Sequence, residues 1–376
     1  MSDTSFEIPQ KFEFTVAQAE QTALDLLAEG TGLSKQRIKD AMNKGAVWWT
    51  LKGKTLRLRR ATKMLYKGSK IQFFYDEQVL ARKPGSANLI YNGGNYSIWF
   101  KPAGMLSQGS QWGDHCSILR WVEVNGQFTQ GRTQRECFLV HRLDGDASGL
   151  IMLAHDSQAA GKLSTLFQAR DMHKSYQAWV TGDCEIPSSG LTLSEALDGK
   201  SAITHLHKVR TEHNKTLLDI TIETGRKHQI RRHLANIGHP IVGDGKYGGP
   251  DSFLTGAVSR KMHLHARRLI ISEPKAGDGT GGKLDVTAEL PPHFAMSMEV
   301  LGFDQSLSDA SPLREETPER TGEEKKQAAR RHFKQAKKEA RTPRRARGAA
   351  NAQSKPKAKL KGKPKPAGKA KPGAKP

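Results

Sequence analysis

The sequence predicts an α+β fold, in which a small α/β domain precedes a mixed, largely antiparallel sheet with helices outside it, and a disordered basic tail follows. Residues 94–300 alternate strand-like apolar runs, helical segments and glycine turns, which is typical of one mixed domain. Residues 12–80 contain helical and strand-like segments of their own. Beyond residue 312 the apolar pattern fades. These three stretches, with a linker at residues 81–93, define the expected domain organisation.

The first predicted domain begins with an amphipathic helix over residues 17–29, whose apolar positions include Leu24 and Leu27. Ser34 stands at the N-cap position of a second helix, and Gly45 is placed to end it. The second helix is expected over residues 35–43, and short strands over residues 46–51, 55–58 and 71–75.

Positive charge is concentrated on this first domain. Lys35 and Arg37 lie on the second helix, and ten further Lys and Arg residues follow before residue 71. Such a charge run is either a solvated face or a surface for a polyanion. The pattern SKQRIKDAMNKGAV…GKTLRLRRATKMLYKGSKIQFF resembles the small RNA-binding domain first recognised in a small-subunit ribosomal protein, and departs from it at Trp48 and Trp49. The resemblance implies that Lys35 and Arg37 contact RNA.

The second predicted domain has a polar loop between two strands, followed by a helix that Asp156 is placed to cap. Asp171 is interpreted as a turn residue. A later helix carries apolar residues on one face and ends at Gly238. The strands are expected at residues 138–140, 150–154, 176–181 and 217–223, and the helices at residues 157–169 and 227–237.

Most of the net charge of +22 belongs to the tail. Residues 311–376 hold 22 Lys and Arg against 6 Asp and Glu, so the preceding residues carry only +6. A segment this polar and charged cannot bury a core and is expected to be disordered. We expect it to tether RNA electrostatically. The alternatives are a solubility segment or, in a eukaryotic source, a nuclear-targeting signal.

The three cysteines, Cys116, Cys137 and Cys184, form no CxxC pair, so neither a disulfide framework nor a zinc ribbon is indicated. The N-terminus has no apolar signal core, and no stretch of about 18 apolar residues is present. These features favour a reduced, cytoplasmic setting with no membrane partner.

The segment HRLDGDASGLIMLA, from His141 to Ala154, is the most informative. Two apolar runs flank a loop that holds Arg142, Asp144 and Asp146. Taken alone, the loop could be an ordinary turn, since Asp and Gly are favoured there.

Four other segments stand in a fixed order around it. They are FKPAGMLSQG at residues 100–109, KSYQAWVTG at 174–182, GRKHQIRRHLANIGHPIVGDGKYGG at 225–249, and HLHARRLIIS at 263–272 with LPPHF at 290–294. Together the five segments resemble the signatures of the RluA-type pseudouridine synthases, over about residues 96–296. Ala147 stands where that family has Thr in HRLDxxTSG.

The resemblance implies an RNA pseudouridine synthase with Asp144 as its catalytic carboxylate, Tyr176 stacking on the uracil and Arg231 as the counter-charge of Asp144. Making pseudouridine breaks a C–N glycosidic bond, rotates the base and joins C5 to the ribose. This adds no group and transfers no electrons, so no cofactor is expected. A carboxylate can attack a glycosidic carbon. The sequence does not distinguish this step from attack of the carboxylate on the base or removal of a ribose proton by it.

The same resemblance implies further contacts with the target. Arg142 is expected to help displace the base from the helix, because a stacked base cannot be reached by an enzyme. Its alternative is a surface Arg paired with Asp146. Further RNA or base contacts are assigned to His141, Arg226, His228 and Gln229.

The histidines do not indicate a metal. His228 and His233 are five residues apart, a poor spacing for one helix face, and no cysteine is close in sequence. His239 belongs to the same candidate group, and the pair His263 and His265 forms a second one, for which zinc is likewise not expected. No metal site is therefore expected.

Large-subunit ribosomal RNA is the expected substrate, with transfer RNA second, and ribosomal particles or their precursors are possible partners of a monomeric enzyme. A rival from another class is a non-catalytic RNA-binding or ribosome-assembly protein on this fold. Another is a hydrolase that uses Asp144 and Asp146, for which no second acid motif is found.

Overall fold

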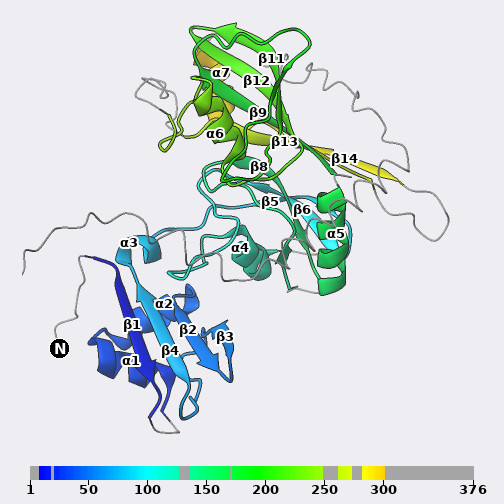
Figure 1. Cartoon of the computed structure of the whole chain (residues 1–376). Helices are drawn as coiled ribbons and strands as arrows, with labels where there is room; N and C mark the ends of the chain where they lie inside the picture. Colours follow the sequence, from blue (N-terminus) through cyan, green and yellow to red (C-terminus); the bar gives the residue numbers. More distant parts are fainter. Residues whose placement is uncertain are drawn as a thin grey trace, which may run out of the picture. The chain divides into compact units, whose positions relative to one another are not determined.

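The computed structural model describes residues 8–17, 21–126, 136–169, 172–248, 261–272 and 282–300 (Figure 1). The basic tail at residues 312–376 and the predicted turn residue Asp171 lie outside these ranges. None of the helices in the described ranges has the length and apolar character needed to cross a bilayer.

The small N-terminal domain is a four-stranded antiparallel sheet packed on two helices (Figure 1). Its strand order is β1-β4-β2-β3. Its own core includes Leu27 of α1, Ile38 of α2 and Phe73 of β4. The elements are β1 (Gln10–Thr15), α1 (Ala23–Thr31), α2 (Lys35–Asn43), β2 (Val47–Leu51), β3 (Lys54–Arg57), β4 (Lys70–Tyr75) and α3 (Glu77–Leu80).

Capping residues set the ends of the two helices. The prediction for α2 is confirmed, because the Ser34 hydroxyl accepts from the Arg37 N–H at 3.5 Å and the helix spans the predicted residues. The first helix was predicted to start at residue 17, and this is wrong. Thr22 is its N-cap, accepting from the Asp25 N–H at 3.1 Å, so α1 begins at Ala23.

The second sheet is mixed and largely antiparallel, as predicted. Its order is β10-β11-β12-β9-β13-β8-β6-β5, with β14 paired to β13 and β7 to β8. Only β13 and β8 pair in parallel among the described strands. The strands are β5 (Asn88–Asn92), β6 (Tyr96–Lys101), β7 (Phe138–Leu139), β8 (Ser148–Ala154), β9 (Met172–Thr181), β10 (Leu191–Leu193), β11 (Thr204–Glu212), β12 (Lys215–Ile222), β13 (Leu264–Ser272) and β14 (Lys283–Thr287).

The predicted linker at residues 81–93 is partly wrong. Asn88–Asn92 forms the edge strand β5, paired antiparallel with β6. The large domain therefore recruits its first strand from a segment whose flanking Gly, Pro and Asn residues indicated only a connection.

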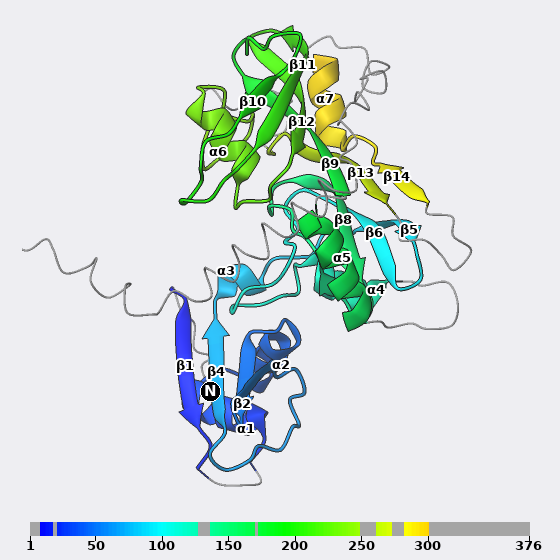
Figure 2. The same cartoon turned by 45° about the vertical axis from the view of Figure 1, so that its right-hand side comes forward.

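Helices cover both faces of this sheet (Figure 2). On one face, buried residues of α4 and α6 share a core with Ala178 and Val180 of β9. On the other face, α5 contacts Met152 and α7 contacts Trp179. These helices are α4 (Ile118–Asn125), α5 (Ser157–Ala169), α6 (Gln229–Asn236) and α7 (Pro292–Val300). The helix predicted at residues 157–169 is confirmed, with Asp156 accepting from the Ala159 N–H.

One glycine permits the parallel pairing of β8 with β13. Gly149 has φ of +113°, and a Cβ there would lie 2.3 Å from the Ala266 carbonyl oxygen. Beside it, the Ser148 hydroxyl and His265 Nδ1 are 3.0 Å apart. These contacts fix the strand that immediately follows the HRLD loop.

Candidate active site

A buried lysine holds the loop that carries Asp144. Lys101 ends β6, and its ammonium donates to the carbonyls of Met105, Gly145 and Ala147 at 2.7, 3.1 and 2.6 Å. Burial lowers the pKa of Lys101 to about 7, against the opposing effect of Asp146 and Asp144. The sequence analysis had no role for this residue, although it is the Lys of the KPAG signature.

Ser107 ties the same loop at a second point. Its hydroxyl donates to the Leu143 carbonyl at 2.6 Å and accepts from the Leu143 N–H at 3.0 Å. The Gly104 N–H also donates to the Gly145 carbonyl at 2.8 Å. The backbone is thus fixed on both sides of Asp144.

Asp144 and Arg231 meet as expected. Arg231 lies in the first turn of α6, and its Nη1 is 3.3 Å from Asp144 Oδ2. The arginine side chain is buried, while the carboxylate keeps some exposure. An anionic group open to a ligand is thereby placed against a fixed cation.

The stronger partner of Arg231 is an acid that the sequence analysis missed. Asp244 accepts from Arg231 Nε and Nη2, both at 2.7 Å, and its own side chain is fully buried. Burial acts to raise the pKa of Asp244, but the bonds from Arg231 and the backbone outweigh it and the pKa is lowered. Arg231 is therefore not a counter-charge for Asp144 alone. In the sequence, Asp244 is marked only by its place in the GHPIVGDGKYGG segment, which does not indicate its partner.

Tyr176 reaches the same place from β9. It is 5% exposed, and burial together with the nearby Asp144 charge raises its pKa, so the phenol stays protonated. Asp144, Tyr176 and Arg231, predicted from three separate segments, are thus brought together.

His228 also faces Asp144. Its Nε2 is 3.8 Å from Asp144 Oδ1, and its Nδ1 is 3.0 Å from the Tyr247 hydroxyl. Burial lowers the pKa of His228, and Asp144 opposes the shift. Its backbone is left-handed, with φ of +53°. This conformation costs a non-glycine residue about 1–3 kcal/mol and occurs often at functional sites.

Four of the other residues predicted to contact RNA have cationic side chains at or near the surface. Arg142 and Arg226 are exposed, and Arg226 Nε donates to the Ser201 carbonyl. Lys35 and Arg37 of the small domain form ion pairs with Asp25 and Glu77. Their cationic groups lie at the surface or partly buried beside it.

His141 and Gln229 do not fit the predicted RNA contact. The Gln229 side chain is buried, with Oε1 accepting from Thr224 and Arg226 and Nε2 donating to Ile203 and Thr204. His141 Nε2 accepts from the Met152 N–H, and its ring packs on Phe167. Both side chains have their polar atoms directed into the fold, so the prediction is corrected to internal support.

The histidines have structural partners. No group of three His, Cys, Asp or Glu residues suited to a metal occurs within the described residues. His233 lies between Thr204 and the Glu195 carbonyl, and His263 bonds Ser297.

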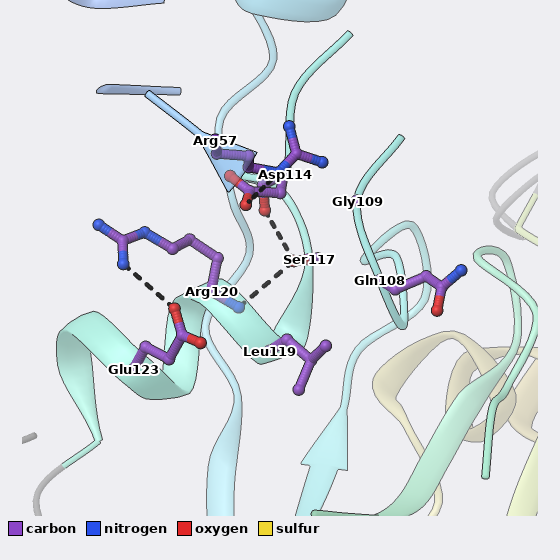
Figure 3. Close-up of a pocket in the computed structure, with 8 residues that line it drawn as sticks. All are labelled: Arg57, Gln108, Gly109, Asp114, Ser117, Leu119, Arg120 and Glu123. Atoms are coloured by element: carbon purple, nitrogen blue, oxygen red, sulfur yellow. Dashed lines mark hydrogen bonds and ion pairs between the residues drawn. The ribbon is translucent and has the colours of Figure 1, made fainter. Parts of the chain in front are cut away.

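A pocket of about 280 Å³ lies elsewhere, beside α4 (Figure 3). Its cations are already paired, Arg57 with Asp114 at 3.0 Å and Arg120 with Glu123 at 3.1 Å. It does not contain Asp144. The full lining is Arg57, Gln108, Gly109, Asp114, Ser117, Leu119, Arg120 and Glu123.

A family model matches the part of the chain that holds Asp144. A family model described as RNA pseudouridylate synthase matches residues 95–236. An uncharacterized RNA pseudouridine synthase of Chloroflexus aurantiacus is 42% identical over 150 residues, covering 37% of this chain and 46% of that protein. The chain thus spans about half the length of this relative.

Two further relatives are matched over most of their length. The ribosomal large subunit pseudouridine synthase D of Xanthomonas campestris pv. campestris is 30% identical, with 58% of this chain and 70% of that protein covered. The dual-specificity RNA pseudouridine synthase RluA of Haemophilus influenzae is 32% identical, with 51% and 89% covered. This chain therefore belongs to the RNA pseudouridylate synthase family, in the RluA type that its five sequence segments resemble.

Proposed function

We propose that this protein isomerises uridine to pseudouridine within structured RNA, with Asp144 as the catalytic carboxylate. The observation that carries the proposal is the convergence on Asp144 of Arg231, His228 and Tyr176, from two other signature segments. An ionised carboxylate held by a fixed cation can act at the sugar carbon of a glycosidic bond.

The proposed reaction balances without an added reactant. The C1′–N1 bond breaks, the free uracil turns, and a C1′–C5 bond forms. One proton leaves C5 and one is gained at N1. The Tyr176 ring would stack on the base and retain it during the turn, a contact of about 1–3 kcal/mol. Arg142, exposed beside Asp144, is suited to fill the space of a displaced base.

Large-subunit ribosomal RNA is the proposed substrate, since several relatives are named for it. Transfer RNA is the second candidate. We further propose a monomeric, cytoplasmic enzyme that acts on ribosomal RNA or its precursor particles. The basic side chains of the small domain, Lys35 and Arg37 among them, would bind the phosphate backbone.

The test is a map of pseudouridines in total RNA from cells with and without the gene. Restoring the wild-type gene should restore the missing positions, and the Asp144→Asn gene should not. If the missing pseudouridine lies in transfer RNA, transfer RNA replaces ribosomal RNA as the proposed substrate. If the two maps are the same, the proposed activity is rejected. Restoration by Asp144→Asn would remove the carboxylate from the mechanism.

A further inference from the structure

The turn at residues 244–247 touches both groups that face Asp144. Asp244 binds Arg231, and Tyr247 binds His228. Arg231 in turn lies on Asp144 Oδ2, while His228 faces Asp144 Oδ1. Each carboxylate oxygen of Asp144 therefore has one basic neighbour, and each neighbour has one hydrogen-bonding partner in the turn.

Asp244 controls the direction of the Arg231 guanidinium. Two parallel bonds of 2.7 Å allow only one rotation of the planar group, which leaves Nη1 directed at Asp144. Asp244 is itself fixed, because Oδ1 accepts from the Lys246 and Tyr247 N–H groups at 2.9 and 3.1 Å.

Tyr247 contacts both basic groups. Its hydroxyl lies 3.0 Å from His228 Nδ1, and its ring centroid lies 5.1 Å from Arg231 Cζ. His228 stands at the N-cap of α6 without a side-chain capping bond. The contact with the tyrosine hydroxyl therefore orients the imidazole toward Asp144.

The turn is anchored to the sheet. Val242 exchanges backbone bonds with Trp179 and His263, at 2.9 and 2.8 Å. Gly243 has φ of +77°, and a Cβ there would lie 2.2 Å from the Lys261 carbonyl oxygen. Such a support can hold an arginine to within a fraction of an ångström.

We infer that Asp244 and Tyr247 are positioning residues of the active site, which aim Arg231 and His228 at the two oxygens of Asp144. The inference rests on the proposed function, because it assigns these residues a part in the same reaction. Neither residue needs to touch the RNA for this role.

The test compares single-turnover rates and RNA affinity for wild type, Asp244→Asn and Tyr247→Phe, on an unmodified large-subunit ribosomal RNA transcript. Asp244→Asn should lower the rate by about 100-fold, with affinity changed less than about twofold, since misplacing a catalytic group by about 1 Å has that effect. Tyr247→Phe keeps the ring and should lower the rate by about fivefold, equivalent to one lost hydrogen bond.

Asp198→Asn is the matched control. Asp198 is an exposed carboxylate that binds Arg232, the residue next to Arg231 on α6, at 2.9 Å. Its loss should leave the rate unchanged, because an exposed ion pair contributes little.

A double-variant cycle separates positioning from general support. In an Arg231→Ala background, Asp244→Asn should lower the rate by less than about threefold further, because the group it aims is gone. The inference would be overturned if the rate losses of Arg231→Ala and Asp244→Asn multiply in the double variant. A single-turnover rate of Asp244→Asn or Tyr247→Phe within twofold of wild type would also overturn it. If Asp244→Asn does not fold, the Tyr247→Phe rate decides. A wild-type enzyme that makes no pseudouridine would instead reject the proposed function.

Discussion

Three buried histidines predict a steep loss of stability in mild acid. His263, His265 and His293 surround Phe294, with ring centroids 5.1, 5.9 and 5.3 Å from it. Burial lowers the pKa of His263 to about 4, of His265 to about 3 and of His293 to about 4, from an ordinary value of 6.5. The folded protein therefore keeps these imidazoles neutral where the unfolded chain takes up protons.

The difference in protonation between the folded and unfolded states sets how the free energy of unfolding changes with pH. Because the folded-state pKa values lie below the unfolded value, stability is complete above pH 6.5 and falls as the pH falls toward 4. A pH of 5 lies about 1.5 units below the unfolded pKa of each imidazole. Each therefore lowers the free energy of unfolding by about 2 kcal/mol, and the three together lower it by about 6 kcal/mol. The total stability of a domain is about 5–15 kcal/mol. Burial raises the pKa of Asp219, which opposes part of this loss.

The assay is urea unfolding at pH 7.5 and pH 5, followed by circular dichroism. His293→Gln, whose amide can still donate to the Met262 carbonyl, should reduce the loss of unfolding free energy by about 2 kcal/mol. His213→Gln, on an exposed turn, should not change it. A wild-type free energy of unfolding that is equal at both pH values, or a His293→Gln loss as large as that of wild type, would refute the reasoning.

Four further outcomes are expected. Asp144→Asn should abolish single-turnover isomerisation while filter binding still detects the RNA complex; substantial residual activity would contradict the assignment. Tyr176→Phe should leave RNA affinity within about twofold of wild type, and Tyr176→Ala should weaken RNA binding by about 1–3 kcal/mol. Equal losses of affinity in the two variants would show that the hydroxyl contributes more to RNA binding than the ring does. Lys101→Met should slow turnover by about 100-fold, because the loop around Asp144 loses its donor; a wild-type rate would show that the loop keeps its shape unaided. Deleting residues 325–376, which hold 20 Lys and Arg against one acid, should weaken RNA binding at low salt and reduce the salt slope, with the same uridine modified; a changed target would show that the tail helps to build the recognition site.

Local signals predicted much of the fold. Ser34 is an N-cap followed by an uninterrupted helical pattern, and α2 begins and ends where the sequence placed it. The error at α1 has a physical cause. Residues 17–29 have helical periodicity throughout, which does not show where the helix begins. The Thr22 hydroxyl accepts from the Asp25 N–H, and this cap fixes the start of α1 at Ala23.

The site was predictable only in part, because contacts between distant segments carry no local signal. The meeting of Asp144 and Arg231 came from the resemblance to a family. The partner Asp244 lies 13 residues beyond Arg231, and nothing in that spacing indicates a bidentate pair. Gln229 stands in a polar segment typical of RNA contact, and its burial follows from tertiary bonds to Ile203 and Thr204.

The parallel pairing of β8 with β13 bears on when the site forms during synthesis. Ser148 and His265 are 117 residues apart in the chain, so the strand behind the HRLD loop has no neighbour on that side until β13 has been made. Closing so long a loop is entropically unfavourable and slows folding. We therefore expect the nascent chain to stay inactive until residue 266 has left the ribosome, although the small N-terminal domain can fold earlier.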